Sequence, residues 1–209
     1  MPSAETILAQ LRTIAAQWQS LAILFHIYFG ILAAALVAGV RPSRKSAGRL
    51  LALPFVSVSA VAWVEGNPFN GAVFAVVWIL LLVLAGRLPA ERVRLAPPAL
   101  LVPGIALFLF GWAYPHFLAG EPAWIYLYRA PTGLIPCPTL SIVIGLALIA
   151  DGLRSRAFGL TLGLAGLLYG AIGVFRLGVA IDAVLLAGAV LMLAVALRKA
   201  PATDGRSIS

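Results

Sequence analysis

Seven apolar segments separated by short polar connections constrain what this chain can fold into. They cover residues 19–40, 50–65, 70–86, 98–114, 135–150, 157–175 and 178–197. A helix needs about 20 predominantly apolar residues to cross a bilayer. Hydrophobic residues make up 62% of the chain and charged residues only 11%, which is far more apolar than a soluble domain. The sequence therefore predicts an all-α, polytopic bundle of about seven transmembrane helices in a cell membrane, with a bacterial inner membrane as the expected location.

The basic residues predict how this bundle is oriented. Twelve of the 15 lysines and arginines fall in the connections of one side, namely Arg41, Arg44, Lys45, Arg49, Arg87, Arg92, Arg94, Arg154, Arg156, Arg198, Lys199 and Arg206. Arg12, Arg129 and Arg176 fall on the other side. Cytoplasmic loops carry the excess of Lys and Arg, so we expect the N-terminus outside and the C-terminus inside. Because the charge of +8 lies next to spans, we expect the lipid bilayer as partner and no nucleic acid.

The chain divides into three regions. Residues 1–18 form an amphipathic N-terminal segment, 19–198 the transmembrane domain, and 199–209 a short polar tail that we expect to be disordered in the cytoplasm. In the first region, apolar residues recur at helical spacing: Ile7, Leu8, Leu11, Ile14 and Ala15. This pattern is typical of a helix on the membrane surface. A simple extension of the first span is the alternative.

Polar and ligating side chains gather in the half of the chain predicted to face outward. The candidate ligand-binding residues are His26, Glu65, Asn67, Tyr114, His116, Cys137 and Thr139. Imidazole and thiolate are ligands of zinc and copper, so His26, His116 and Cys137 form a candidate site for a transition metal. These three residues belong to separate segments, and only the fold can bring them together. The sequence predicts an outward-facing site for a metal ion or a small solute.

Each of these residues also has an ordinary structural interpretation. Cys137, in the first turn of a predicted helix, is either a reactive thiol or a small side chain packed between helices. His26 lies inside a span, where it is a functional candidate or simply bonds a carbonyl or a tyrosine. His116 is a ligand or an interfacial residue. Glu65 is a ligand or a solvated carboxylate in the turn before Asn67 and Pro68.

A stripe of small residues in the sixth segment predicts close helix packing. Its members recur every three or four residues: Gly159, Gly163, Gly166, Gly170 and Gly173. Such stripes let helix backbones approach closely in membranes. The partner of the stripe is the last segment, another span of the chain, or a second copy or other membrane protein, so homo-oligomerisation through this stripe stays open.

Four short stretches, LFHIYF (24–29), EGNPFN (65–70), WAYPHF (112–117) and GLIPCPT (133–139), resemble a family of small bacterial multi-pass membrane proteins with a Pro-Cys-Pro-Thr motif, catalogued as a domain of unknown function. The matching positions are His26, Asn67, Pro68, Tyr114, Pro115, Gly133, Pro136, Cys137, Pro138 and Thr139. The resemblance covers most of the first five segments. It implies a multi-pass membrane protein and no particular activity.

Two classes of function follow from these patterns. The first is a transporter or sensor whose outward-facing site uses the polar residues named above. The second is a structural or accessory membrane subunit without a ligand of its own, in which the same residues only satisfy helix ends. A membrane enzyme ranks third, because no recognisable nucleophile and base occur together in the sequence.

Overall fold

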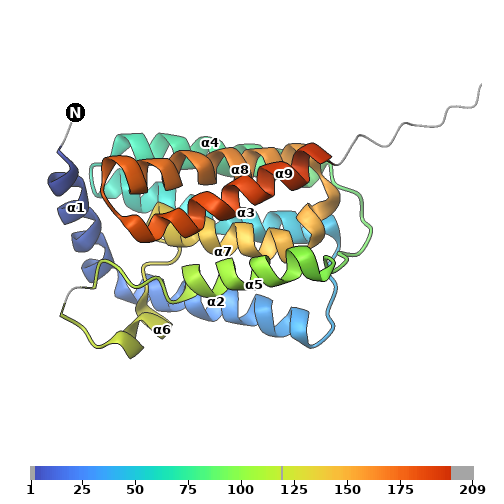
Figure 1. The fold of residues 1–209 in the computed structure, drawn as a ribbon, viewed down its shortest axis with the longest axis horizontal. Helices are drawn as coiled ribbons and strands as arrows, with labels where there is room; N and C mark the ends of the chain where they lie inside the picture. The colour runs from blue at the N-terminus through green and yellow to red at the C-terminus, as the bar shows by residue number, and fades with distance from the viewer. Residues whose placement is uncertain (1–2, 119, 199–209) are drawn as a thin grey trace, which may run out of the picture.

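The computed structural model describes residues 3–118 and 120–198. Seven helices run side by side along its long axis (Figure 1). They are α2 (Gln19–Val37), α3 (Arg44–Val64), α4 (Pro68–Gly86), α5 (Pro98–Trp112), α7 (Pro136–Ile149), α8 (Arg156–Ala171) and α9 (Ala183–Arg198). Each corresponds to one of the predicted apolar segments. The prediction of an all-α bundle is therefore confirmed for the described residues.

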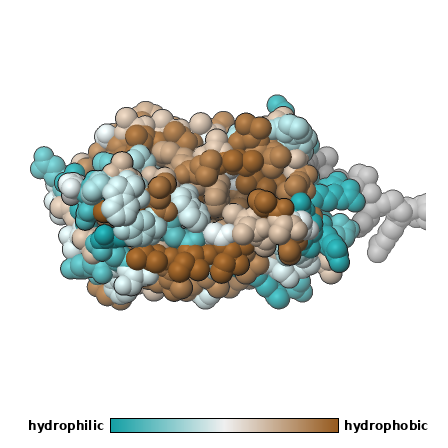
Figure 2. Space-filling model, turned by 90° about the horizontal axis from the view of Figure 1, so that it is seen from below, coloured by the Kyte–Doolittle hydropathy of each residue, from teal (hydrophilic) through white to brown (hydrophobic). Residues whose placement is uncertain are grey.

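Within the described residues, five stretches of helix are long and apolar enough to cross a membrane. They comprise α2, α3, α4, α8 together with the π-helical turn η3 (Ile172–Arg176), and α9 together with the 3-10 turn η4 (Ala180–Asp182). The helices α5 and α7 are apolar but shorter. Figure 2 shows the resulting surface, an apolar band between two hydrophilic ends. These features are those of a membrane protein.

Helix boundaries follow local capping rather than hydropathy. The predicted second segment begins at residue 50, whereas α3 begins at Arg44 because the Ser43 hydroxyl accepts a hydrogen bond from the Ser46 amide. Hydropathy detects only the apolar part of this helix and misses its basic first turns. The side chain of Asn67 caps α4 in the same way, accepting from the Asn70 amide at 3.1 Å.

The N-terminal helix α1 (Ala4–Gln17) is separate from α2 and lies across one end of the bundle (Figure 1). Its buried face consists of Leu11, Ile14 and Ala15, which belong to the predicted apolar face. These side chains pack in an apolar cluster with Phe117 and Ile135 of other segments. Residues 4–17 therefore form a helix of their own and do not extend α2, which was the alternative interpretation of this segment.

The helix α7 is the centre of the bundle. Every one of its residues except Cys137 is buried. Glycines bring α5 against it, since a Cβ at Gly145 would lie 2.6 Å from the Phe108 amide nitrogen and one at Gly111 would lie 2.6 Å from the Pro138 carbonyl oxygen. The rest of the chain therefore surrounds α7, and its side chains contact protein instead of lipid.

The glycine stripe of α8 packs against α9 of the same chain. A Cβ at Gly170 would lie 3.0 Å from the backbone of Leu186, and one at Gly163 would lie 2.7 Å from the side chain of Leu193. Gly166 faces both Ala189 on α9 and Ile144 on α7. Of the partners that the sequence left open, the last segment is therefore the one that covers the stripe.

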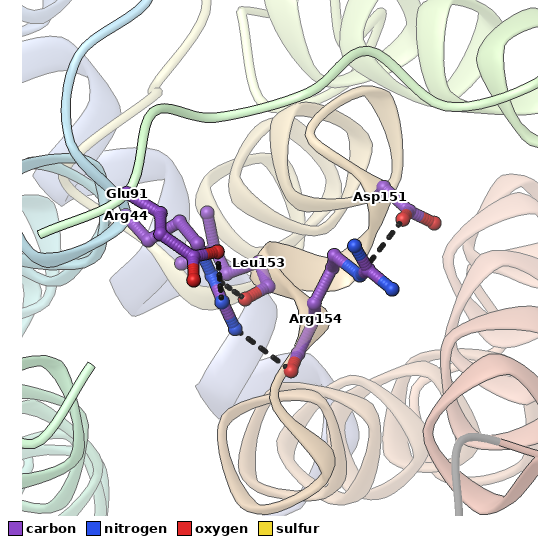
Figure 3. A network of polar contacts seen from close by, with 5 residues as sticks. All are labelled: Arg44, Glu91, Asp151, Leu153 and Arg154. Atoms are coloured by element: carbon purple, nitrogen blue, oxygen red, sulfur yellow. Dashed lines mark hydrogen bonds and ion pairs between the residues drawn. The ribbon is translucent and has the colours of Figure 1, made fainter. Parts of the chain in front are cut away.

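Three basic connections meet at the end of the bundle opposite α1 (Figure 1), and Figure 3 shows the polar contacts that join them there. Arg44 donates from Nε to the Leu153 carbonyl at 2.7 Å and from a terminal nitrogen to the Arg154 carbonyl at 2.9 Å. It also pairs with Glu91 at 3.4 Å. The turn η2 (Asp151–Arg154) that supplies these carbonyls has a positive φ at all four residues, of which only Gly152 is a glycine. Arg44 thus stabilises a strained backbone.

Candidate functional site

A cavity of about 420 Å³ opens at the end of the bundle where α1 lies. Six parts of the chain line it: one face of α1, the turn and first residues of α4, Phe117 in the loop after α5, the start of α7, the end of α8 with η3, and the residues just before α9. Its volume is in the range of small-molecule sites. Most of the wall is apolar, and a few polar groups face the interior, which is the usual composition of such a site.

The short α7 explains why there is space at this end. Its 14 residues span about 21 Å at 1.5 Å per residue, less than the roughly 30 Å of a bilayer core. The non-helical segment 130–135 precedes the helix and is buried throughout. Irregular backbone at membrane depth is tolerated where protein surrounds it or where it lines a cavity. The cavity therefore lies at the start of a short helix.

The start of α7 is held by hydrogen bonds of Thr139. Its hydroxyl donates to the Ile135 carbonyl at 2.7 Å and accepts from the Gly133 amide at 2.8 Å. Gly133 has a φ of +77°, and the ring of Phe25 occupies the place of a Cβ there, so only glycine fits. This arrangement places Cys137 in the first turn of α7 and on the cavity wall.

Asp182 is the most unusual group of the cavity. It lines the wall and is only 1% exposed. The Tyr114 hydroxyl donates to its Oδ1 at 2.7 Å, and the Cys137 thiol forms a side-chain hydrogen bond with the same carboxylate. Both donors are neutral. Gly173 makes room for this carboxylate, because a Cβ at that position would collide with Oδ2.

A second polar pair lies on the neighbouring wall. The Tyr169 hydroxyl donates to the Asn70 side-chain oxygen at 2.9 Å, and both residues line the cavity. Asn70 is buried in the first turn of α4, and Tyr169 is buried near the end of α8. The helix then changes to the π-helical turn η3, and such turns are frequent at functional sites.

Two hydrogen bonds fix α1 beside the cavity. The Gln10 side chain donates to the Glu65 carbonyl oxygen at 2.5 Å, and the Trp18 indole donates to the Glu65 carboxylate at 2.9 Å. Ile7 and Leu11 of the same helix contribute to the wall. Glu65 therefore anchors the helix that covers one side of the cavity, while exposed Phe69 and Arg176 form part of its rim.

The predicted site residues are only partly brought together. Asn67 and Cys137 line the cavity, and Tyr114 binds Asp182 from behind its wall. Glu65 and Thr139 lie close by in structural roles. His26 is away from the cavity, where its ring nitrogens lie 2.8 Å from the Ala22 carbonyl oxygen and 3.0 Å from that of Trp112.

His116 lies in the loop after α5 and packs edge-on against Phe117, with ring centroids 4.3 Å apart. Its Nε2 is buried without a hydrogen-bond partner among the described residues. Burial, and secondarily the positive charge of Arg12, lower the pKa of His116 below its ordinary value. The imidazole is thus held in its neutral form at the end of the bundle where α1 lies.

The metal site expected from the sequence is not formed. Residues 3–118 and 120–198 contain no group of three or more His, Cys, Asp or Glu side chains arranged to hold a metal ion. His26 places both ring nitrogens against carbonyl oxygens, and the Cys137 thiol bonds Asp182 instead of facing a histidine. Zinc and copper need several ligands within about 2.0–2.3 Å, so His26, His116 and Cys137 do not fit either metal.

Sequence reasoning did not select Asp182, Asn70 or Tyr169 as site residues. A signal existed for Asp182, since it falls inside the predicted segment 178–197 and a carboxylate within a span is a functional candidate. Asn70 has the weaker signal of an amide at the start of an apolar run. Tyr169, next to Gly170 of the stripe, has none.

Comparison with known proteins adds no further constraint on the site. No protein-family model, no curated protein and no solved structure matches the chain. The family resemblance carried by the Pro-Cys-Pro-Thr stretch therefore stays a prediction, and the functional argument rests on the cavity itself.

Proposed function

We propose that the protein crosses a bacterial inner membrane seven times, with the N-terminus outside and the C-terminus in the cytoplasm. The contacts support this topology, because the connections assigned to one side meet one another. Arg44 binds the turn at Arg154, and Ser43 pairs with Arg92. At the opposite end α1 binds the Glu65 turn. The excess of basic residues then identifies the cytoplasmic end.

On this topology the cavity opens to the outside, and its function is to bind a small solute for transport or sensing. One observation carries this proposal: a buried carboxylate, Asp182, lines a cavity with an apolar wall and a second polar pair, Asn70 and Tyr169. A carboxylate inside a membrane protein is costly unless it is paired, and it commonly marks a ligand or ion site. A metal ion is not part of the proposal.

The alternative is an accessory subunit without its own ligand. It is favoured by the local partners that His26, Glu65 and Thr139 find. Under this alternative the Tyr114–Asp182 hydrogen bond only ties two loops together. The volume beside Asp182 argues against it, because a purely structural tie is usually closely packed.

The test uses the thiol on the cavity wall. Cells producing the full chain are treated with a membrane-impermeant maleimide, and we expect labelling of Cys137 from outside. An Ile7→Trp variant fills the mouth beside α1 and should label markedly more slowly. Ile27→Trp is the matched control, because Ile27 is 55% exposed on the outer surface of α2 and does not line the cavity.

A second cysteine serves as the control for the case in which Cys137 is not labelled. In a Cys137→Ser background, Glu121→Cys supplies a thiol in the exposed loop after α5. Labelling of that thiol, with none of Cys137 in the otherwise unchanged chain and none of a second thiol on the cavity wall, supplied by Ile172→Cys in the Cys137→Ser background, would mean that the cavity is closed to the outside. The proposal of an outward-facing binding site would then be wrong.

A further inference from the structure

We infer that the ligand of this cavity is an amphipathic organic cation whose ammonium group binds Asp182 and whose hydrocarbon part lies along the apolar wall. This inference rests on the proposed function and adds the chemical class of the ligand. It comes from the charge, remaining bonding capacity and surroundings of one carboxylate.

The first step concerns the hydrogen bonds of Asp182. A carboxylate offers about four lone-pair positions. Tyr114 and Cys137 each donate one bond to it, and both are neutral groups. Neutral donors offset only part of the cost of burying a full charge. A ligand that supplies both a positive charge and further N–H donors would offset more of that cost, and an ammonium group has three such donors.

The second step concerns where this carboxylate lies. Asp182 is 1% exposed to solvent and yet lines the cavity, so water reaches it only through the cavity. The effective dielectric constant is low in such a place, and a charge pair formed there is stronger than one at the surface. The binding energy is therefore concentrated at the inner end of the cavity.

The third step concerns the remaining wall. Ile135, Ile172 and Val179 present aliphatic surface, and Phe117 and Tyr169 add aromatic rings. Aliphatic surface favours the hydrocarbon part of a ligand by about 25 cal/mol per Å² buried. Aromatic faces also attract cations. A free inorganic cation would leave this surface without a partner, and a fully apolar molecule would leave the carboxylate without one.

Arg176 on the rim raises the competing possibility of an anionic ligand. It is exposed, whereas Asp182 is buried at the inner end. An exposed guanidinium contributes little binding energy, because water and salt screen it. We therefore assign the charge recognition to Asp182, and the experiment includes an anionic probe.

The experiment measures binding to the purified full chain in nanodiscs of zwitterionic phosphatidylcholine by isothermal titration, with empty nanodiscs as the background. Three probes share one hydrocarbon skeleton and differ in their polar group: phenethylammonium, 2-phenylethanol and 3-phenylpropanoate. We expect phenethylammonium to bind at least about tenfold more tightly than the alcohol, as a charge-assisted hydrogen bond provides. The carboxylate should bind most weakly.

Two variants locate the site. Asp182→Asn keeps the shape and still accepts from Tyr114, so it should lose the preference for phenethylammonium while binding the alcohol normally. Glu121→Gln is the control, because it removes an exposed carboxylate at the same end of the molecule and should change nothing. The comparison of the three probes is made on the unchanged chain, so it tests the inference even if a variant fails to fold.

The outcomes separate this inference from the proposed function. Equal binding of the ammonium and the alcohol, or unchanged selectivity in Asp182→Asn, would overturn the cationic ligand and leave a cavity that binds apolar solutes. Preference for the carboxylate would assign the charge recognition to the Arg176 rim and also overturn it. Binding of none of the probes, together with an unlabelled Cys137, would overturn both proposals.

Discussion

Asp182 and His116 show at the residue scale how the surroundings of polar groups differ within one end of the bundle, the end where α1 lies. Asp182 has two neutral hydrogen-bond donors and a cavity beside it. Its carboxylate therefore has hydrogen-bond partners and space for a further donor. His116 has a buried Nε2 without a hydrogen bond among the described residues, and a cation, Arg12, nearby. Asp182 thus keeps open space beside a buried, hydrogen-bonded carboxyl group, whereas the surroundings of His116 favour the neutral imidazole.

We expect acid to destabilise the fold through His116. Its pKa lies below the ordinary 6.5 because of burial and the charge of Arg12. In the window between the lowered pKa and 6.5 the unfolded chain binds more protons than the folded one. The contribution of His116 to stability is thus complete above pH 6.5 and is lost as the pH falls through its folded-state pKa. Thermal melting of the purified chain between pH 7.5 and 5 measures this loss.

Two variants isolate the contribution of His116. His116→Gln should melt with a flatter dependence on pH than the unchanged chain. Arg12→Gln removes the second cause of the shift and should narrow the window without abolishing it. A pH profile that is the same with and without His116 would mean that other groups cause the acid sensitivity.

At the element scale, glycines determine which helices approach most closely. The stripe on α8 faces α9, and a second set formed by Gly104, Gly111 and Gly145 joins α5 to α7. Side chains of larger residues would hold these backbones apart. The polar turns between the helices are stabilised in other ways, among which the binding of η2 by Arg44 is the clearest.

We predict that Gly166→Leu and Gly170→Leu prevent folding or lower the melting temperature strongly. A Cβ at Gly166 already meets Ile144 at 2.6 Å, and one at Gly170 meets Leu186 at 3.0 Å. Overpacking of this kind costs about 1–3 kcal/mol or more. Gly86→Leu on α4 is the matched control, since nothing lies within 4 Å of its Cβ position. Unchanged melting of both stripe variants would show that the α8–α9 contact is misplaced.

The Arg44 network leads to a prediction that compares its hydrogen bonds to backbone carbonyls with its ion pair to Glu91. Arg44→Met removes charged donors from the carbonyls of Leu153 and Arg154, and we expect a loss of about 2 kcal/mol of unfolding free energy. Glu91→Gln removes only an ion pair whose carboxylate side is 70% exposed, worth about 0–1 kcal/mol. Thermal or denaturant melting in detergent compares the variants. Equal losses would mean that the ion pair, not the bonding of the strained turn, carries the effect.

At the scale of the whole molecule, the two ends of the bundle differ in chemistry. One end gathers the basic connections around Arg44 (Figure 3). The other end, where α1 lies (Figure 1), holds the cavity and the buried carboxylate of Asp182. The apolar band between them is the part that a bilayer would surround (Figure 2). This division gives the molecule a direction across the membrane, and the proposed function depends on that direction.

Reporter fusions test the direction. We expect a periplasm-active reporter to give a signal when placed after residue 121, in the loop between α5 and α7. A cytoplasm-active reporter should give a signal when placed after Glu91 in the basic connection between α4 and α5. The paired fusions control for each other at each site. The reversed pattern would place the cavity on the cytoplasmic side and overturn the outward-facing site.

The sequence alone was sufficient to predict the apolar helices of the bundle. Hydropathy identifies the apolar helices because the surroundings of each segment are apolar, whether they consist of lipid or, as for α7, of neighbouring helices. Alternating connections likewise divide between two ends by simple order along the chain. Boundaries were less accurate, as at Arg44, because capping by Ser43 depends on hydrogen bonds that hydropathy does not measure.

The functional site was decided by the tertiary structure. The sequence offered His26, His116 and Cys137 as equivalent candidates in one outer half, and the fold brings them together in no shared site. Instead it brings Tyr114, Cys137 and Asp182 together from three separate parts of the chain, beside Asn70 and Tyr169. Sequence pattern determines the depth of a side chain in the membrane. Which side chains meet depends on how the helices rotate and pack against one another. Glycines contribute to this packing in the folded bundle, and Gly173, for example, leaves the space that the carboxylate of Asp182 occupies.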